Sequence, residues 1–98
     1  MTSYKYDVVY STKFKKALKK LIKQGKDINE LFDIIDKLAN DEKLNMKYKN
    51  HSLVNDKYYK DCNECHINPD WLLIYRYNKD KLLLLLIDTG SHSELFKK

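Results

Sequence analysis

Glycine, proline and arginine are scarce in this chain, and a long apolar run is missing. The 98 residues include two glycines, one proline and a single arginine. So few glycines and prolines argue against long flexible linkers, and neither internal repeats nor low-complexity stretches are visible. The longest apolar run, residues 82–87, has six residues and is far too short to span a bilayer. We therefore expect a single domain over residues 1–98 with no membrane segment.

The N-terminus lacks the apolar core of a secretory signal peptide. Its first twenty residues alternate in hydropathy and carry repeated lysines. The absence of an export signal predicts a cytoplasmic protein, in which cysteines stay reduced.

Cysteine is also rare, with only Cys62 and Cys65, followed by His66. This spacing matches a haem-attachment pattern and supplies part of a zinc site. In a strand, however, residues three apart point to opposite faces, so the two thiols would not bind one metal or haem together. A second Cys/His pair at zinc spacing is missing. We predict two free thiols, no metal and no cofactor.

Charge is segregated along the chain, although the net charge is only +5. Residues 1–26 hold eight lysines and one aspartate, whereas residues 27–46 hold six acids and two lysines. Because nearly all cations are lysines, the surface favours attraction of phosphates over bidentate reading of bases. A merely solvated lysine-rich helix face is the alternative that charge leaves open. The candidate nucleic-acid-binding residues are Lys13, Lys15, Lys16, Lys19, Lys20 and Lys23.

Hydrophobic periodicity predicts two helices after an initial strand. Residues 4–10 alternate as in a half-buried strand. Ser11 or Thr12 can then cap a helix that ends at Gly25, with apolar positions at helical spacing. A second amphipathic helix is predicted to start at Asp27, with Glu30 in capping-box position. The two helices would form an antiparallel hairpin whose apolar faces need a sheet to cover.

The second half of the chain reads as three strands after a long polar loop. The loop spans residues 40–56, and the strands span 58–67, 71–77 and 82–87, with a hairpin turn at 78–81. Because residues 82–87 lack polar alternation, we expect a central strand buried on both faces. The C-terminal segment, residues 88–96, can form one helical turn capped by Ser91 or Ser93. The predicted fold is α+β, ordered βααβββ, with the helix hairpin on one face of an antiparallel sheet.

The stretch 65–75 combines groups suited to chemistry with a rigid support. It holds His66, a proline-fixed turn over residues 68–71, Asp70 and Trp71, directly before an apolar strand. A reversal there would bring His66 and Asp70 to one end of the sheet. Histidine is the side chain best suited to exchange protons near neutrality, so convergence with His51 and His92 would create an acid–base site.

Each of these residues also has a plainer interpretation. Taken singly, a histidine is more often an ordinary surface residue, Asp70 a turn former and Trp71 a core residue. Trp71 would otherwise support the site or stack a base. Arg76 either stabilises a phosphate transition state or pairs with a nearby acid.

Three segments together carry a resemblance that covers nearly the whole chain. They are KNHSL at 49–53, ECHINPDWLLIY at 64–75 and GSHSELF at 90–96, in addition to the basic first helix. In this order and spacing the chain resembles the YafQ-type toxins of the RelE/ParE superfamily, bacterial type II toxin–antitoxin proteins that cleave messenger RNA on the ribosome. The resemblance implies a RelE-like fold and an endoribonuclease.

The resemblance also assigns roles to individual positions. The positions that match the family's catalytic residues are His51, His66, Asp70 and His92, and those that match supporting residues are Trp71 and Phe96. Many relatives carry an arginine three residues before the central histidine, where this chain has Asn63. Lys60, Arg76 or ribosomal RNA would then supply the positive charge.

Metal-free RNA cleavage needs a base that removes the 2′-OH proton, an acid that protonates the leaving 5′ oxygen, and a cation for the phosphate. We assign His66 with Asp70 to one side and His92 to the other, with His51 tuning or sharing the base role. The implied partners are an antitoxin protein, the ribosome through its 16S rRNA, and mRNA.

Two other function classes compete with this reading. A ParE-like inhibitor would bind DNA gyrase without catalysis and would have no need of three proton carriers. A basic RNA-binding module would depend on the lysines and not on the histidines.

Overall fold

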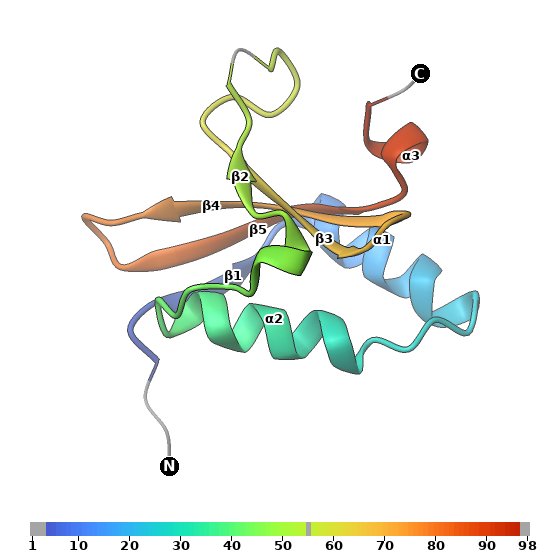
Figure 1. Cartoon of the computed structure of the whole chain (residues 1–98), viewed down its shortest axis with the longest axis horizontal. Coiled ribbons are helices and arrows are strands. Elements are labelled where there is room, and N and C mark those ends of the chain that lie inside the picture. Colours follow the sequence, from blue (N-terminus) through green and yellow to red (C-terminus); the bar gives the residue numbers. More distant parts are fainter. Residues whose placement is uncertain (1–3, 55, 97–98) are drawn as a thin grey trace.

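A computed structural model describes residues 4–54 and 56–96. Its centre is a five-stranded sheet with the strand order β1-β5-β4-β3-β2. In Figure 1, α1 and α2 lie on one side of this sheet, while α3 and residues 56–62, before β3, lie on the other. The predicted α+β class with the helix pair on one face is confirmed. The elements in chain order are β1 (Asp7–Tyr10), α1 (Thr12–Lys23), α2 (Asn29–Ala39), the 3₁₀ helix η1 (Met46–Tyr48), β2 (His51–Ser52), β3 (Asn63–Asn68), β4 (Trp71–Asn78), β5 (Leu83–Gly90) and α3 (His92–Phe96).

The sheet is mixed, which corrects the prediction that it is antiparallel throughout. β1 pairs with β5 in parallel, from Asp7 opposite Leu83 to Tyr10 opposite Leu86, while the other pairs are antiparallel. A parallel pair needs a crossover connection, and here both helices and three strands lie between the two partners. The hydropathy pattern of β1 predicts a strand. It does not predict whether the strand that pairs with β1 runs parallel or antiparallel to it.

The leucine run forms β5, but only one of its faces is fully buried. Leu84 and Leu86 are 0% exposed, whereas Leu83, Leu85 and Ile87 are half-buried. Leu82 precedes the strand, with a positive φ of 54°, and is exposed. The prediction of burial on both faces is therefore wrong, because helices cover one face and only short segments cover the other.

The first helix begins as predicted, and the second begins later. The Ser11 hydroxyl accepts a hydrogen bond from the Phe14 amide at 3.0 Å and so caps α1. Asp27 instead accepts from the Asn29 amide in a turn that precedes α2, whose cap position is Ile28. Asp27 is therefore a turn residue outside the helix, because its carboxylate bonds two residues on, before helical geometry starts.

The region predicted as a long loop and a long polar strand divides differently. The loop contains η1 and the two-residue strand β2, and the strand predicted from residue 58 starts only at Asn63. The Asp56 carboxylate accepts hydrogen bonds from the amides of Tyr58 and Tyr59, which closes a turn at the point where the strand was expected. The predicted turn over residues 68–71 is confirmed, with the Asp70 amide donating to Asn68 Oδ1 at 3.0 Å.

Two apolar clusters lie on the two faces of the sheet. The larger joins α1 and α2 to the strands through residues such as Phe14, Leu31, Leu73 and Leu84. The smaller lies under α3 and consists of Tyr59, Cys62, Leu72, Ile74 and Leu95. Strand alternation explains the division, since Leu72 and Leu73 are neighbours in β4 but face opposite sides. Within residues 4–54 and 56–96, no helix is long and apolar enough to cross a membrane.

Candidate active site

Two of the three histidines meet at one buried carboxylate. Glu64 Oε1 lies 3.3 Å from Nε2 of His66 and 3.5 Å from Nε2 of His51. The centroids of the two imidazole rings are 6.4 Å apart, and the Glu64 side chain is only 6% exposed. Glu64 thus forms the centre of a compact acid–base group that sequence reasoning did not include.

Strand geometry explains this convergence. Glu64 and His66 are two residues apart in β3 and therefore point to the same face, while Cys65 between them points into the larger core. His51 lies directly opposite Glu64 in the β2–β3 pair. The two-residue strand β2, which the sequence did not predict, is what brings His51 to the site.

The ring of His51 is oriented by the backbone. Its Nδ1 lies 2.7 Å from the carbonyl oxygen of Lys49. A carbonyl oxygen can only accept, so Nδ1 carries a proton and Nε2 faces the Glu64 carboxylate. The second nitrogen of His51 is therefore directed at the same group as His66.

His92 reaches this face from the C-terminal helix. Its ring stacks at a tilt on Phe96, with centroids 4.8 Å apart, and the rings of Phe96 and Tyr59 form a T-shaped pair with centroids 5.6 Å apart. His92 shares a hollow of about 460 Å³ with His51 and Glu64, which we name the histidine hollow. The residues that line the histidine hollow are His51, Leu53, Asp56, Lys57, Tyr58, Glu64, His92 and Phe96.

The buried Tyr59 holds α3, the helix that contributes His92 and Phe96 to the histidine hollow. The Tyr59 hydroxyl donates to Asp88 Oδ2 at 3.1 Å and lies 3.0 Å from the carbonyl oxygen of Leu95 in α3. Burial, and secondarily the charge of Asp88, raises the pKa of Tyr59, so its proton stays in place as a donor. Tyr59 thereby ties β5, α3 and the segment before β3 together.

Asp70 and Trp71 lie apart from the histidine pair. Asp70 is exposed in the β3–β4 turn, and in the described part of the chain its carboxylate forms no hydrogen bond or ion pair with His66. Trp71 is buried in the larger core, and its indole Nε1 donates to Thr89 Oγ1 at 2.8 Å. Trp71 therefore supports the end of β5 that leads into α3.

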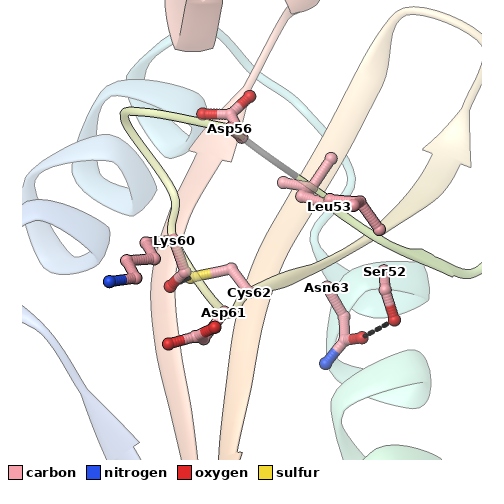
Figure 2. A pocket seen from close by; sticks show the side chains of 8 residues that line it. Ser52, Leu53, Asp56, Lys60, Asp61, Cys62 and Asn63 are labelled. Carbon is pink, nitrogen blue, oxygen red and sulfur yellow. Dashed lines mark hydrogen bonds between the residues drawn. The ribbon is translucent and has the colours of Figure 1, made fainter.

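The two cations proposed to replace the missing arginine lie in neighbouring hollows. Lys60 lines a hollow of about 640 Å³ with Asp56, Asp61 and Cys62 beside β3, and Ser52 there donates to Asn63 Oδ1 at 3.1 Å (Figure 2). Arg76 is exposed on β4 and lines a further hollow with Asp61, Asn78 and Asp80. Neither cation lines the histidine hollow, whereas Lys57, which the sequence reading left out, does.

All six lysines proposed for RNA binding are exposed on α1, but two of them also form ion pairs. Lys13 Nζ lies 3.3 Å from Asp88 Oδ2, and Lys20 Nζ lies 2.7 Å from Glu94 Oε2. Lys15, Lys16, Lys19 and Lys23 are exposed at other positions of the helix. One side of α1 therefore forms ion pairs within the protein, and its other lysines present positive charge to solvent.

The cysteine geometry matches the prediction. Cys62 lies in the smaller cluster and Cys65 in the larger, on opposite faces of the sheet, and both thiols are free. Burial raises the pKa of Cys65 to about 12, which keeps it an unreactive thiol at neutral pH. Across residues 4–54 and 56–96, no group of three His, Cys, Asp or Glu side chains is arranged to hold a metal ion.

The residues that sequence reasoning missed carry weak local signals. Glu64 was visible only as part of a polar strand, although its spacing of two from His66 already implies a shared face. Tyr58 is the first residue of a predicted strand, and Lys57 lies between that strand and the predicted loop, so neither prediction directs their side chains at the histidines. Tyr59 and Asp88 are separated by 29 residues, so their hydrogen bond has no signature along the chain.

Comparison with known proteins gives concordant matches. Residues 6–97 match the family described as "Bacterial toxin of type II toxin-antitoxin system, YafQ". The chain is 38% identical to the mRNA interferase toxin YafQ of Escherichia coli strain B / BL21-DE3 over 91 residues, covering 92% of this chain and 95% of that protein.

Solved structures agree in fold. A metal-bound toxin from Helicobacter pylori is 43% identical and superposes with a TM-score of 0.86, covering 93% of this chain and 99% of that one. The E. coli DinJ-YafQ toxin–antitoxin complex gives 36% identity and a TM-score of 0.82, covering 94% and 98%. The family match and these relatives extend over nearly the full chain, the histidine hollow included. The chain therefore belongs to the YafQ family of bacterial type II toxin–antitoxin toxins.

Proposed function

We propose that this protein is a ribosome-dependent mRNA endonuclease that cleaves by attack of the 2′-OH on the adjacent phosphate. The observation that carries the proposal is the group of His51, His66 and Glu64 with His92 across the histidine hollow. The names of the E. coli relatives, mRNA interferase toxins, point to the same reaction class. A purely binding protein has no need of this concentration of proton carriers.

In the proposed reaction, His66 or His51 takes the 2′-OH proton and His92 protonates the leaving 5′ oxygen. Glu64 holds the two imidazoles in place and stabilises the positive charge that forms when one of them accepts a proton, as the carboxylate does in a catalytic triad. Asp70 stays in the proposal as a further acid–base group, which approaches the RNA from the β3–β4 turn. Such general acid–base catalysis contributes about 10²–10⁴ in rate for each group.

Positive charge for the phosphate comes in this proposal from Lys57, which lines the histidine hollow, with Lys60 and Arg76 on the flanks. Phe96, already packed on His92, holds the acid in place. Lys15, Lys16, Lys19 and Lys23 on α1 hold ribosomal RNA phosphates in this proposal, and this contact would be salt-dependent.

We further propose a cognate antitoxin as the protein partner. The DinJ-YafQ structures are complexes of a relative with its antitoxin. An acidic antitoxin segment over the basic, histidine-bearing face would neutralise its charge and block access to RNA.

The proposed cleavage is independent of metal, although two similar structures, a metal-bound and a copper-bound mutant toxin from Helicobacter pylori, hold a metal. The described residues offer no group of three ligating side chains suitably placed, and histidines with a carboxylate suffice for the proton transfers. The test treats the toxin with EDTA, removes the EDTA, and only then adds Mg²⁺-dependent ribosomes. We expect undiminished cleavage by the treated toxin.

The decisive experiment maps mRNA 5′ ends by primer extension in a translating extract. Wild type, His92→Ala and a ribosome-free control are run side by side. We expect ribosome-dependent cuts that fall by about 10²–10⁴ in rate in His92→Ala, equivalent to roughly 3–5 kcal/mol of barrier. Translation arrest or growth inhibition without cuts, unchanged in His92→Ala, would replace the endonuclease with a binding inhibitor.

A further inference from the structure

The short helix that carries His92 is tied to α1 by one carboxylate. Glu94 Oε2 lies 2.7 Å from Lys20 Nζ, and its other oxygen, Oε1, accepts a hydrogen bond from the Ser91 amide at 2.8 Å. The Glu94 amide in turn donates to Ser91 Oγ at 3.2 Å, which completes a capping box. Glu94 therefore serves at once as the cap of α3 and as the link to α1.

This link lies beside the only backbone connection between β5 and α3. A Cβ added at Gly90 would sit 3.1 Å from Glu94 Oε1, so the carboxylate is packed directly against the chain at this point. Gly90 is the last residue of β5, and His92 is the first residue of α3. The carboxylate therefore lies against the point where the chain leaves the sheet, two residues before His92.

The other contacts described for this helix lie at its C-terminal end. It has five residues, too few to be stable in isolation, and Leu95 is its one buried side chain. The Tyr59 hydroxyl fixes the carbonyl of Leu95 at the far end. The Lys20–Glu94 contact fixes the near end, where His92 lies.

We infer that Lys20 and Glu94 are positioning residues for His92, and that Lys20 acts within the protein rather than on RNA. The inference rests on the proposed function of His92 as the general acid. The pair holds α3 at the angle that places the imidazole in the lining of the histidine hollow, together with His51 and Glu64. Holding a reacting group in place is a large part of enzymatic rate enhancement, so a small tilt of α3 slows the chemical step without weakening RNA binding.

A second ion pair on the same side of α1 supports this interpretation. Lys13, seven residues before Lys20 and hence on the same side of the helix, contacts Asp88, the partner of Tyr59. The groove between α1 and α3 is lined by both lysines together with Thr89, Gly90 and Glu94. This side of α1 is therefore engaged along its length with the end of β5 and with α3.

Charge reversal separates the two possible roles of Lys20. We compare Lys20→Glu, Glu94→Lys and the double variant that exchanges the two charges, all in the full-length chain. The pair is partly exposed, so its single reversals should lower the single-turnover cleavage rate at saturating toxin by about 3–10-fold, with the half-saturating concentration unchanged. The double variant should recover most of the wild-type rate, because the contact is restored with opposite sense.

Lys19→Glu is the matched comparison, one position away on the same helix and exposed. If Lys19 binds phosphate, its reversal should raise the half-saturating concentration and reduce the slope of log affinity against log salt by about 1, leaving the saturated rate intact. The positioning role would be overturned if Lys20→Glu, like Lys19→Glu, raised the half-saturating concentration and left the saturated rate intact, and if the double variant did not restore the wild-type values.

Hydrogen exchange provides a readout that does not depend on cleavage. The Leu95 amide donates to the carbonyl of Ser91 within α3, at 3.0 Å. We expect this amide to exchange faster in Lys20→Glu and to return to the wild-type rate in the double variant. Unchanged exchange in Lys20→Glu would overturn the inference. If instead His92→Ala cleaves as well as wild type, the proposed function fails, and the exchange data still report separately whether the pair holds α3.

Discussion

The two faces of the sheet differ in what buries them. Among the described residues, the larger cluster under α1 and α2 joins seventeen buried residues, and the smaller cluster under α3 joins five. The face with the smaller cluster also carries Glu64, His66 and the exposed His51. One face thus supplies most of the burial that drives folding, and the other has room for polar groups that an apolar core would not tolerate.

This difference teaches how a short chain can combine stability with chemistry. Strand alternation sends Cys65 into the larger core and its two neighbours, Glu64 and His66, to the open face. β3, which packs against the larger cluster through Cys65, then holds Glu64 and His66 in place. Changes on the two faces should accordingly affect different measurements.

The largest expected effect is on the helix-covered face. Phe14→Ala removes a side chain that is 0% exposed, and we expect a loss of about 3–5 kcal/mol in the free energy of unfolding. Urea unfolding measures this loss. Ile22→Ala on the same helix, at a site 52% exposed, is the control and should change stability by less than about 0.5 kcal/mol. Equal losses in the two variants would refute the assignment of the larger cluster as the stabilising core.

A smaller effect, on rate instead of stability, is expected on the open face. Glu64→Gln keeps the shape of the side chain but removes the charge that faces His51 and His66. Loss of a charged contact should lower the single-turnover cleavage rate by about 10–100-fold, equivalent to roughly 1.5–3 kcal/mol. Glu42→Gln, at an exposed site, serves as the control. A cleavage rate that stays at the wild-type value in Glu64→Gln would remove Glu64 from the proposed mechanism.

The smallest expected effect concerns the pH dependence of stability. The hydrogen bond from Lys20, with a further one from the Ser91 amide, holds the pKa of Glu94 at about 2, below the ordinary value of 4.5. A carboxyl whose pKa is lower in the folded state contributes stability above pH 4.5, and this contribution disappears as the pH falls toward 2.

Glu94→Gln should therefore be slightly less stable than wild type near pH 7, and the difference should vanish near pH 2. Thermal unfolding of both proteins across this range measures it, and the effect should shrink at high salt because the pair is partly exposed. A difference that grows as the pH falls would contradict the role assigned to this carboxylate.

Much of the fold could be predicted from periodicity and turn chemistry. The helix stripe with its Ser11 cap, the turn at Pro69 and the capped helical turn after Ser91 are all local patterns, and the structure confirms them. The errors concern pairing and coverage. The parallel partner of β1, the strand β2 and the half-open face of β5 depend on segments far away in the sequence.

The site divides in the same way. The sequence pointed to His51, His66, His92 and Phe96, because these residue types in segments of this spacing resemble a known family, and three of them line one hollow. It did not point to Glu64 as their common partner, nor to the separation of Asp70 from His66. The position of Glu64 depends on which residue lies opposite it in the β2–β3 pair, and the position of Asp70 depends on the geometry of the β3–β4 turn. Residue type alone predicts neither.

By itself, the sequence determined the two helices with their apolar stripes, most of the strands and the chemical groups: where the first helix starts, which residues can exchange protons and where the positive charge lies. The tertiary structure decided which of these groups act together. It set Glu64 between two histidines, and it turned Lys20 toward Glu94 and away from its neighbours on α1. Local patterns follow from backbone sterics and hydrogen bonding within a few residues. Partners such as His51 and Glu64, 13 residues apart, or Lys20 and Glu94, 74 residues apart, meet only when the burial of both sheet faces is satisfied at once.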